Sequence, residues 1–361
     1  MTERYIFGAG IQGQAFLKVF QKLGLPVSGF IDSFSTRESY NDLPVQRPEA
    51  VNNKEAEIYV SVGMISEKIK EQLKTDLFQN VYDYTETVLK YPDIIHALKI
   101  YSLWYSENIE DRVNQQKLNE FRALLVDDKS RQLLDQLIRF RTSFKVEDYV
   151  LRDTEAQYFP DDVPIFEGLK TLRFVDAGAF IGDTIPPLIT HSQKSNTAID
   201  YIACFEPDKK NLKALHEQLD TCCDDAINVF VYPTGVWSRS EILNFAANQS
   251  SSSCITTQEG PVDLSQSILA TSIDECLFNT RPNYIKMDIE GAEAEALKGA
   301  KKTIQTYSPV LAICLYHKPS DLWELPLMIH SMNTQYEMYL RVYGDMLLET
   351  VLYCIPKQKG N

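Results

Sequence analysis

Two stretches place glycines directly after an apolar run, where a predicted strand turns into a helix. In FVDAGAFIGDT, residues 174–184, the run ends on Asp176, and Gly178 and Gly182 follow. In YIFGAGIQG, residues 5–13, the glycines follow without an acid. Turns of this kind hold nucleotides, because glycine lets a ligand approach the backbone and a helix N-terminus closely. The sequence therefore predicts two candidate nucleotide sites.

The turn at Asp176 suits a cationic ligand that carries no phosphate. Acids on both sides of the glycines, Asp176 and Asp183, oppose a pyrophosphate. S-adenosylmethionine has an amine, a sulfonium, a ribose and an adenine. Glu206, at the next strand end, would accept hydrogen bonds from the ribose hydroxyls, and Trp237 or its neighbours would wall the adenine. The predicted cofactor-binding residues are Asp176, Gly178, Ala179, Phe180, Gly182, Asp183, Glu206, Val236, Trp237 and Asp288.

More acids and a histidine stand at neighbouring strand ends. KMDIEGAEAEAL, residues 286–297, places Asp288, Glu290 and Glu293 at the mouth of a helix, and His317 ends a later apolar run. Acids at a helix N-terminus are also ordinary partners of the helix dipole, which accounts for Glu293. Asp288 and His317 would face the crevice at the carboxyl edge of a parallel sheet. We predict that His317, Asp288 and Glu290 are catalytic.

The elements that position these residues alternate between strand and helix from residue 171 onward. Such alternation predicts an α/β fold, a parallel sheet with helices on both faces. The predicted strands are 172–176, 201–206, 228–233, 284–288 and 309–317, and the predicted helices are 183–192, 208–219 and 292–304. Residues 241–257 predict an inserted hairpin, and residues 335–356 predict two antiparallel strands joined at 343–345.

The N-terminal segment predicts a smaller Rossmann-like unit. Its predicted strands are 4–8, 27–32 and 57–63, and its predicted helices are 14–23 and 64–76. YIFGAGIQG fits the GxGxxG pattern, and Asp32 closes the next strand about 20 residues later. Gly8, Gly10, Gly13 and Asp32 form the predicted N-terminal nucleotide site. Three strands are too few for a full dinucleotide fold, so a docking or dimerisation domain with an empty turn stays open.

Length and composition limit the possible domains, partners and location of the protein. The chain has 361 residues, and we predict a small Rossmann-like domain over 1–92, a helical connector over 93–157 and a larger domain over 158–361. The net charge of −14 opposes binding to nucleic acid. The seven cysteines are scattered, which indicates reduced thiols. We see no signal peptide and therefore predict a cytoplasmic protein. No apolar stretch reaches about 20 residues, so we predict no membrane span.

Five motifs in order, DAGAFIGDT, FEPD, IKMDIEGAEAEALKGA, LAICLYHKPSDLWELP and ETVLYCIP, resemble the FkbM-type methyltransferases. The resemblance implies the class I methyltransferase sheet and S-adenosylmethionine-dependent methylation of hydroxyls on sugars, as in polysaccharide biosynthesis, or on other secondary metabolites. It implies cofactor roles for Asp176, Gly178, Gly182 and Glu206, and places Asp288, Glu290 and His317 around the transferred methyl. The N-terminal domain resembles the sugar-nucleotide-binding domains that precede some sugar acyltransferases. That resemblance implies a nucleotide sugar, or NAD, as its ligand.

Several alternatives stay open. His317, with an ordinary pKa of about 6.5, would take the acceptor proton, and Asp288 or Glu290 would orient it or replace it as base. Two acids and the histidine would otherwise hold a divalent metal, although we assign no metal ligand. An NAD(P)-linked oxidoreductase or epimerase using the first turn, and a non-catalytic nucleotide-binding scaffold, are the competing functions. The expected partner is a small-molecule or glycan acceptor, and a homodimer stays open.

Overall fold

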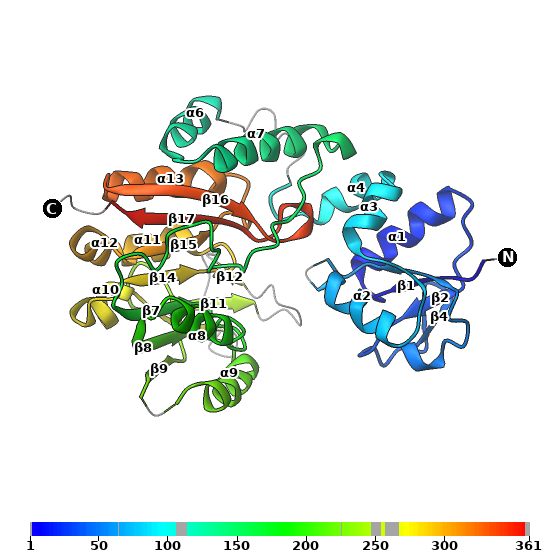
Figure 1. Cartoon of the computed structure of the whole chain (residues 1–361), viewed down its shortest axis with the longest axis horizontal. Helices are drawn as coiled ribbons and strands as arrows, with labels where there is room; N and C mark the ends of the chain where they lie inside the picture. The colour runs from blue at the N-terminus through cyan, green and yellow to red at the C-terminus, as the bar shows by residue number, and fades with distance from the viewer. Residues whose placement is uncertain are drawn as a thin grey trace. The chain divides into compact units, whose positions relative to one another are not determined.

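The chain forms two compact α/β units (Figure 1). The computed structural model describes residues 2–63, 65–105, 114–224, 226–246, 254–256 and 267–357. The first unit comprises Met1–Glu110, Asp135–Asp153 and Gly344–Leu348. The second unit comprises Asp111–Leu134, Thr154–Tyr343 and Glu349–Asn361.

The first unit contains a six-stranded sheet in the order β3-β4-β2-β1-β5-β6. Its strands are β1 (Arg4–Phe7), β2 (Gly29–Ile31), β3 (Ser39–Tyr40), β4 (Leu43–Gln46), β5 (Glu57–Val60) and β6 (Asn80–Tyr82). Neighbouring strands pair in parallel, except β3 and β4, which pair antiparallel. The prediction of three strands was therefore wrong. The extra strands β3, β4 and β6 have two to four residues each and contain polar residues or proline, so they give no apolar run.

The helices of the first unit are α1 (Ile11–Lys22), α2 (Ser66–Thr75), α3 (Tyr84–Lys90) and α4 (Asp93–Leu98), with short 3-10 turns at Pro48–Ala50, Lys99–Tyr101 and Val146–Asp148. The two predicted helices of this unit, 14–23 and 64–76, are present as α1 and α2, whereas α3 was not predicted. Helix α1 ends just before Gly24, whose φ of +68° is the left-handed conformation that closes many helices. Helix α3 begins at a capping box formed by Asp83 and Glu86.

The second unit is built on a seven-stranded sheet in the order β16-β17-β15-β14-β7-β8-β9. Its strands are β7 (Thr171–Ala177), β8 (Ala198–Phe205), β9 (Asn228–Tyr232), β14 (Tyr284–Met287), β15 (Val310–Cys314), β16 (Tyr336–Val342) and β17 (Thr350–Pro356). The five strands from β15 to β9 run parallel, and β17 pairs antiparallel with both β15 and β16. This arrangement confirms the predicted α/β, Rossmann-like fold class with an antiparallel C-terminal hairpin.

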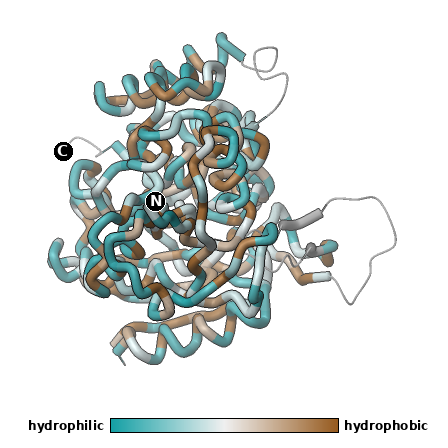
Figure 2. Tube along the Cα trace, turned by 90° about the vertical axis from the view of Figure 1, so that its right-hand side faces the viewer, coloured by the Kyte–Doolittle hydropathy of each residue, from teal (hydrophilic) through white to brown (hydrophobic). Residues whose placement is uncertain are grey.

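Helices pack around this sheet in two groups. Helices α10 (Ile273–Leu277), α11 (Glu293–Gly299), α12 (Lys301–Tyr307) and α13 (Asp321–Met332) contact one another, and α8 (Ile185–Lys194) contacts α9 (Lys209–Cys222). Helix α6 (Gln115–Leu124) packs on α13. Hydrophobic and hydrophilic residues alternate around the helices (Figure 2), as expected where one helix face covers a core. Strands β14 and β15 are buried at every position, as central parallel strands are.

Two details differ from the predicted elements. The predicted helix 292–304 is divided into α11 and α12 at Ala300, directly after Gly299, where a Cβ would lie 2.0 Å from the Trp237 carbonyl oxygen. A second sheet, in the order β10-β13-β11-β12, was not predicted. Its strands are β10 (Gly235–Val236), β11 (Glu241–Ala246), β12 (Cys254–Thr256) and β13 (Ser267–Thr271).

Strands β11 and β12 form the predicted antiparallel hairpin, whose tip, residues 247–253, lies outside the described residues. A further helix, α7, spans Asp128–Ser143. The boundary between the two units falls inside it, between residues 134 and 135. Among the described residues, no helix combines the length and the apolar character that crossing a membrane requires.

Candidate active site

The glycine turn after β7 rests against the end of β14. Gly178 has a φ of +80°, and a Cβ there would lie 1.9 Å from the carbonyl oxygen of Asp288. Gly182 has a φ of +82°, and its Cβ would lie 2.9 Å from a methyl carbon of Leu215. Only glycine accepts both the positive φ and the close approach without strain. Gly178 thus lets the turn approach the strand end that carries Asp288, and Gly182 lets it approach helix α9.

Glu206 follows β8 and is bonded to the same turn. Its Oε2 accepts a hydrogen bond from the Phe180 N–H at 2.9 Å, and its Oε1 accepts from the Asp208 N–H at 2.8 Å. The Asn211 side chain also donates to Oε1, at 3.2 Å. Burial raises the pKa of Glu206, and these hydrogen bonds oppose the shift. A carboxylate has about four acceptor positions, so one remains for a hydroxyl group.

Asp176 has no exposed surface. Its carboxylate lies 2.9 Å from Nζ of Lys286, its register partner on β14. Lys286 also donates to the Gly178 carbonyl at 2.6 Å. Burial alone would lower the pKa of Lys286, but Asp176 and Asp288 outweigh it and raise that pKa. Lys286 is therefore a cation, and the pair supports the turn from inside.

The other predicted cofactor residues lie at different depths. Ala179 is buried, whereas Phe180 and Asp183 are exposed. Val236 is buried in β10, and the next residue, Trp237, donates its N–H to the Thr271 carbonyl at 2.8 Å. Val236 belongs to the second, four-stranded sheet, and Trp237 follows it directly. The Trp237 carbonyl oxygen also lies close to Gly299 at the end of α11.

The three predicted catalytic side chains lie together. His317 lies three residues beyond β15, which ends at Cys314, so the predicted strand was too long. Its Nε2 lies 3.4 Å from Asp288 Oδ1 and 3.7 Å from Glu290 Oε2. Its Nδ1 lies 3.0 Å from Oε1 of Glu293. The His317 side chain is 2% exposed, whereas that of Glu290 is 26% exposed. Glu290 is therefore the more accessible of the two to an acceptor.

Burial and charge give these groups unusual protonation. Burial alone would lower the pKa of His317, but the carboxylates of Glu293, Asp288 and Glu290 outweigh it and raise that pKa to about 10. Burial raises the pKa of Glu290 to about 7, against the opposing charge of His317. Burial opposes ionisation of Asp288 too, but Lys286 and His317 hold its pKa below the ordinary value. At neutral pH His317 is a cation, and Glu290 is near its midpoint.

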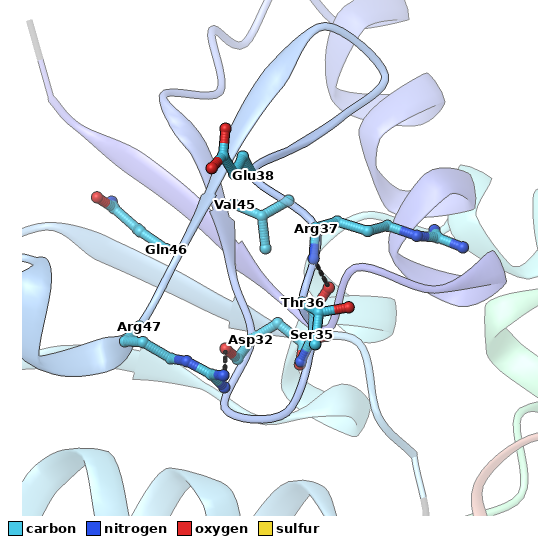
Figure 3. A pocket seen from close by; sticks show the side chains of 8 residues that line it. All are labelled: Asp32, Ser35, Thr36, Arg37, Glu38, Val45, Gln46 and Arg47. Carbon is cyan, nitrogen blue, oxygen red and sulfur yellow. Dashed lines mark hydrogen bonds between the residues drawn. The ribbon is translucent and has the colours of Figure 1, made fainter.

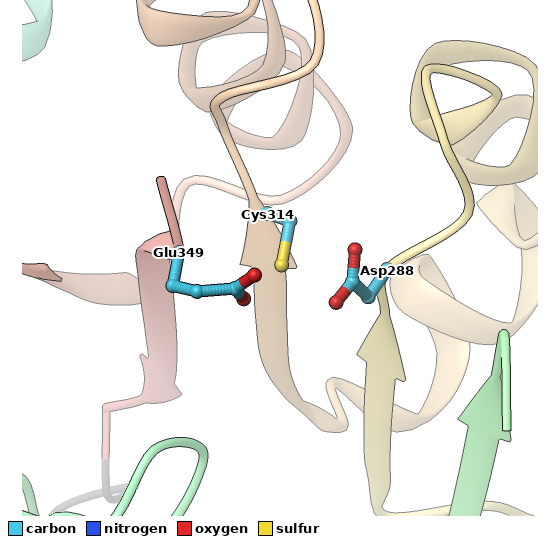
Figure 4. Close-up of side chains that lie close together, drawn as sticks. All are labelled: Asp288, Cys314 and Glu349. Carbon is cyan, nitrogen blue, oxygen red and sulfur yellow. The ribbon is translucent and has the colours of Figure 1, made fainter. Parts of the chain in front are cut away.

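Sequence reasoning missed a second layer of polar residues around Asp288. The Tyr158 hydroxyl donates to Asp288 Oδ2 at 2.8 Å. The Tyr316 hydroxyl lies 3.1 Å from both Asp288 Oδ1 and Glu349 Oε1, so it links the two carboxylates. Burial is the main cause that raises the pKa of Glu349 to about 7. Figure 4 shows Asp288, Cys314 and Glu349 converging from neighbouring strand ends.

Some of this layer had a signal in the sequence. Tyr316 precedes His317, and Glu349 follows soon after the predicted turn at 343–345, so topology alone would have placed both near the carboxyl edge of the sheet. Tyr158 is the first residue of the predicted larger domain, and nothing in the sequence distinguishes it.

Two sets of potential metal ligands share Asp288. The ligand atoms of Asp288, Cys314 and Glu349 lie within 4.8 Å of one another, and so do those of Asp288, Glu293 and His317. Both Asp288 oxygens already accept tyrosine hydrogen bonds. Metal binding by histidine requires a neutral imidazole, whereas His317 is held as a cation. In the protein alone the cluster is an ion-pair network, and a metal at His317 would have to displace the proton that the three carboxylates hold there. The metal alternative therefore stays open.

The predicted N-terminal site lies wholly within the first unit. Gly8 follows β1 with a φ of +103°, and Gly10 precedes α1. Gly13 lies in the first turns of α1, and Asp32 follows β2. Asp32 Oδ2 accepts a hydrogen bond from the Ala9 N–H at 3.1 Å. The structure thus brings Asp32 to the glycine turn.

A family model of known proteins matches the part of the chain that contains the candidate active site. Residues 176–346 match the family model of the methyltransferase FkbM domain. The match includes the glycine turn, Glu206, Asp288, Glu290 and His317. The match supports the chain as a methyltransferase.

Solved structures add information about the fold. The crystal structure of the methyltransferase FkbM from Methylobacillus flagellatus KT has a TM-score of 0.62 and 23% sequence identity, covering 98% of this chain and 90% of that chain. This similarity shows a shared fold. The citrinin polyketide synthase CMeT domain has a TM-score of 0.29 and 8% identity, covering 97% of this chain and 89% of that one, which is too distant to support an argument. No curated protein matches the chain.

Proposed function

We propose that this protein is an S-adenosylmethionine-dependent O-methyltransferase acting on a hydroxyl of a sugar or another small-molecule or glycan acceptor. The observation that carries the proposal is the contact between the glycine turn and Asp288. Gly178 packs on the Asp288 backbone, and Asp288, Glu290 and His317 cluster at that strand end. A cofactor turn and a group able to accept a proton therefore share one edge of the sheet.

The residues present fit this cofactor. Glu206 is fixed by three hydrogen bonds and keeps acceptor capacity for a ribose hydroxyl. Asp183 gives the turn an exposed acid that favours a cationic ligand. Val236 and Trp237 are the proposed wall for the adenine. When bound, S-adenosylmethionine supplies an activated methyl electrophile. Asp176 acts indirectly, by neutralising the Lys286 that holds the Gly178 carbonyl.

Glu290 is our proposed general base. The sequence favours His317, but a cationic imidazole has no lone pair to take a proton, and its side chain is almost fully buried. Glu290 is more exposed, and its raised pKa matches a base working near neutral pH. Glu290 takes the acceptor proton as the new O–C bond forms, while the His317 cation holds the carboxylate in place.

The competing functions receive less support. An NAD(P)-linked oxidoreductase or epimerase is not favoured, because the family match is to a methyltransferase domain. A non-catalytic scaffold has no need for the buried cluster of acids around His317. A cytoplasmic location and a homodimer are also parts of the proposal. Sedimentation measurements would test the homodimer.

Methyl transfer from labelled S-adenosylmethionine to a panel of free sugars, nucleotide sugars and glycans tests the function. We expect label in an ether linkage on one acceptor class for the wild type. The variant Glu290→Gln should lose most of this transfer, whereas Glu295→Gln, an acid on the same helix start, should keep it. Transfer to nitrogen or carbon, or equal transfer by both variants, would contradict the proposed reaction or base.

A further inference from the structure

Two clusters of charged side chains have no part in the proposed mechanism. One lines a cavity in the first unit and carries two acids and two arginines, Asp32, Glu38, Arg37 and Arg47 (Figure 3). The wall of that cavity therefore has no net charge that would select a ligand. The other cluster surrounds Glu349, a residue of the second unit that is only 6% exposed. A buried carboxyl group is costly unless it is hydrogen-bonded, so the partners of Glu349 indicate what it does.

Five side chains form a ring of hydrogen bonds that includes Glu349. The Tyr158 hydroxyl donates to Asp288 Oδ2 at 2.8 Å, and the Gln157 amide donates to Glu349 Oε2 at 2.5 Å. The Tyr316 hydroxyl lies 3.1 Å from Asp288 Oδ1 and 3.1 Å from Glu349 Oε1. The peptide bond between Gln157 and Tyr158 closes the ring. The ring therefore joins one loop to the neighbouring ends of β14, β15 and β17 (Figure 4).

Two residues of the ring have a backbone conformation that is unfavourable for their type. Tyr158 has a φ of +69°, and Glu349 has a φ of +54°. Residues other than glycine are strained in this left-handed region and persist there only where the surrounding contacts fix them. The Tyr158 N–H donates to the Tyr353 hydroxyl at 3.0 Å, and the Tyr158 carbonyl accepts from the Tyr284 hydroxyl. The ring is therefore fixed by further hydrogen bonds from outside it.

The contacts of Tyr316 require one more hydrogen than its hydroxyl supplies. A tyrosine hydroxyl has a single hydrogen, so Tyr316 donates to only one of its two carboxyl partners. If both carboxyls were ionised, the other contact would place the hydroxyl oxygen against an anion with no hydrogen between them. Both contacts are satisfied only if one carboxyl carries a proton and donates it to the Tyr316 oxygen.

The charges around the two carboxyls favour Glu349 as the protonated one. Burial opposes ionisation of both groups, but Lys286 and His317 outweigh it at Asp288 and hold the pKa of Asp288 below its ordinary value. At Glu349, burial and the Asp288 anion act in the same direction and raise the pKa to about 7. The hydrogen bonds therefore run from Glu349 to Tyr316, and from Tyr316 to Asp288.

We propose that Glu349 is a positioning residue for methyl transfer, a neutral carboxylic acid that directs the Tyr316 hydroxyl toward Asp288. The Asp288 carboxylate then accepts from Tyr158 at one oxygen and from Tyr316 at the other, which fixes its orientation. This inference rests on the proposed function, because methyl transfer is the reaction that the ring serves.

The orientation of Asp288 reaches the proposed base through His317. Asp288 Oδ1 lies 3.4 Å from His317 Nε2, and the same nitrogen lies 3.7 Å from Glu290 Oε2. Rotation of the Asp288 carboxylate would move one of the anions that hold the His317 cation. Glu290 would then lose its fixed partner. We therefore expect loss of the ring to reduce turnover and to leave cofactor binding nearly unchanged.

Turnover and calorimetry with S-adenosylhomocysteine, both on the full chain, test the proposal. Glu349→Leu removes two ring contacts and should lower kcat about tenfold or more, with little change in S-adenosylhomocysteine affinity. Glu349→Gln should recover most of the lost turnover, because its amide N–H can donate to Tyr316 while its carbonyl accepts from Gln157. Tyr336→Phe removes a buried hydroxyl that donates to the Pro309 carbonyl at 2.7 Å, and should keep the wild-type kcat.

Infrared difference spectra report the proton without any need for activity. Just below neutral pH, the wild-type spectrum minus that of Glu349→Gln should contain the carbonyl band of one protonated carboxyl group, shifted in heavy water. A difference spectrum that shows only an ionised carboxylate would overturn the proposal. So would a Glu349→Gln variant as impaired as Glu349→Leu, because the carboxylate itself would then be required, as for a metal ligand.

Failure of this proposal is distinguishable from failure of the proposed function. A folded wild type that binds no S-adenosylhomocysteine would overturn the methyl transfer and the positioning role together. Wild-type binding and turnover, combined with full turnover in Glu349→Leu, would overturn the positioning role alone.

Discussion

At the scale of single residues, the buried charged side chains of the candidate active site lie in ion pairs. Lys286 neutralises Asp176, and His317 lies among three carboxylates. The strand-end rule was enough to group Asp288, Glu290 and His317 from the sequence. It did not find the Asp176–Lys286 pair, because that contact depends on the register between β7 and β14. Protonation states were also beyond the sequence, since they depend on burial and neighbouring charge.

The first prediction concerns the pH dependence of methyl transfer. Glu290 must be ionised to take a proton, so kcat should rise with pH through about 7, the pKa of its carboxyl. Glu290→Gln should lower kcat by about 10²–10⁴-fold and leave the affinity for S-adenosylhomocysteine nearly unchanged. Initial rates between pH 5 and 9 measure both. A variant with wild-type kcat would show that Glu290 is not the base.

A second prediction separates the roles of His317 and Glu290. The His317 cation lowers the pKa of Glu290, so His317→Asn should move the midpoint of the rate profile to higher pH. The variant should still show a rise of rate with pH. If His317 were itself the base, His317→Asn would instead lose nearly all turnover at every pH. The rate profile of this variant therefore decides between the two.

A third prediction follows from the buried ion pair. Asp176→Asn would break the buried ion pair with Lys286, and loss of one partner of such a pair costs about 3–5 kcal/mol of unfolding free energy. Asp183→Asn removes an exposed acid from the same turn and should change stability little. Urea unfolding of both variants gives the comparison. Equal stability of the two would mean that the Asp176–Lys286 pair does not hold the turn.

At the scale of elements, the long strands and helices were predictable, and the short ones were not. Strands β7, β8, β9, β14 and β15 carry apolar runs bounded by turn residues, so their existence and order followed from the pattern. Strands β3, β4 and β6 are stabilised by pairing with a sheet rather than by their own pattern. The division between α11 and α12 at Ala300 was not predicted, because residues 292–304 have one continuous helical pattern.

The glycine turn gives an element-scale prediction. Alanine at Gly178 or Gly182 would suffer backbone strain of about 1–3 kcal/mol, because both have positive φ. Gly178→Ala should cost more, since its Cβ meets a backbone oxygen, whereas that of Gly182 meets a side chain that is able to move. It should also displace Asp288 and reduce turnover. Thermal unfolding and rate measurements on the two variants check the order, and a less stable Gly182→Ala would contradict it.

At the scale of the whole molecule, the first unit is assembled from three separate parts of the chain. The loop Gly344–Leu348 belongs to it, and Asp345 in that loop accepts hydrogen bonds from Thr85 at 2.6 Å and Tyr149 at 2.9 Å. The buried Trp104 donates to the Met346 carbonyl at 3.0 Å. Local sequence patterns do not predict this assembly, because its contacts join residues up to 260 positions apart.

This assembly predicts the behaviour of a fragment. A chain limited to residues 1–92, our sequence-based first domain, would lack Tyr149, Trp104 and the Asp345 loop. We expect it to show poorly dispersed amide resonances and no cooperative thermal transition, in contrast to the full chain. A dispersed spectrum with a cooperative transition would instead show that residues 1–92 form an independent domain.

The central claim is that the strand ends of the second unit bind S-adenosylmethionine, and calorimetry with S-adenosylhomocysteine tests it most directly. We expect the wild type to bind, and Glu206→Ala to bind about 10–150-fold more weakly, because a charge-assisted hydrogen bond contributes ~1.5–3 kcal/mol. Glu217→Ala, an exposed acid on the nearby helix α9, is the matched control and should bind like the wild type. Absence of binding by the folded wild-type protein, or equal affinity in Glu206→Ala, would contradict the account.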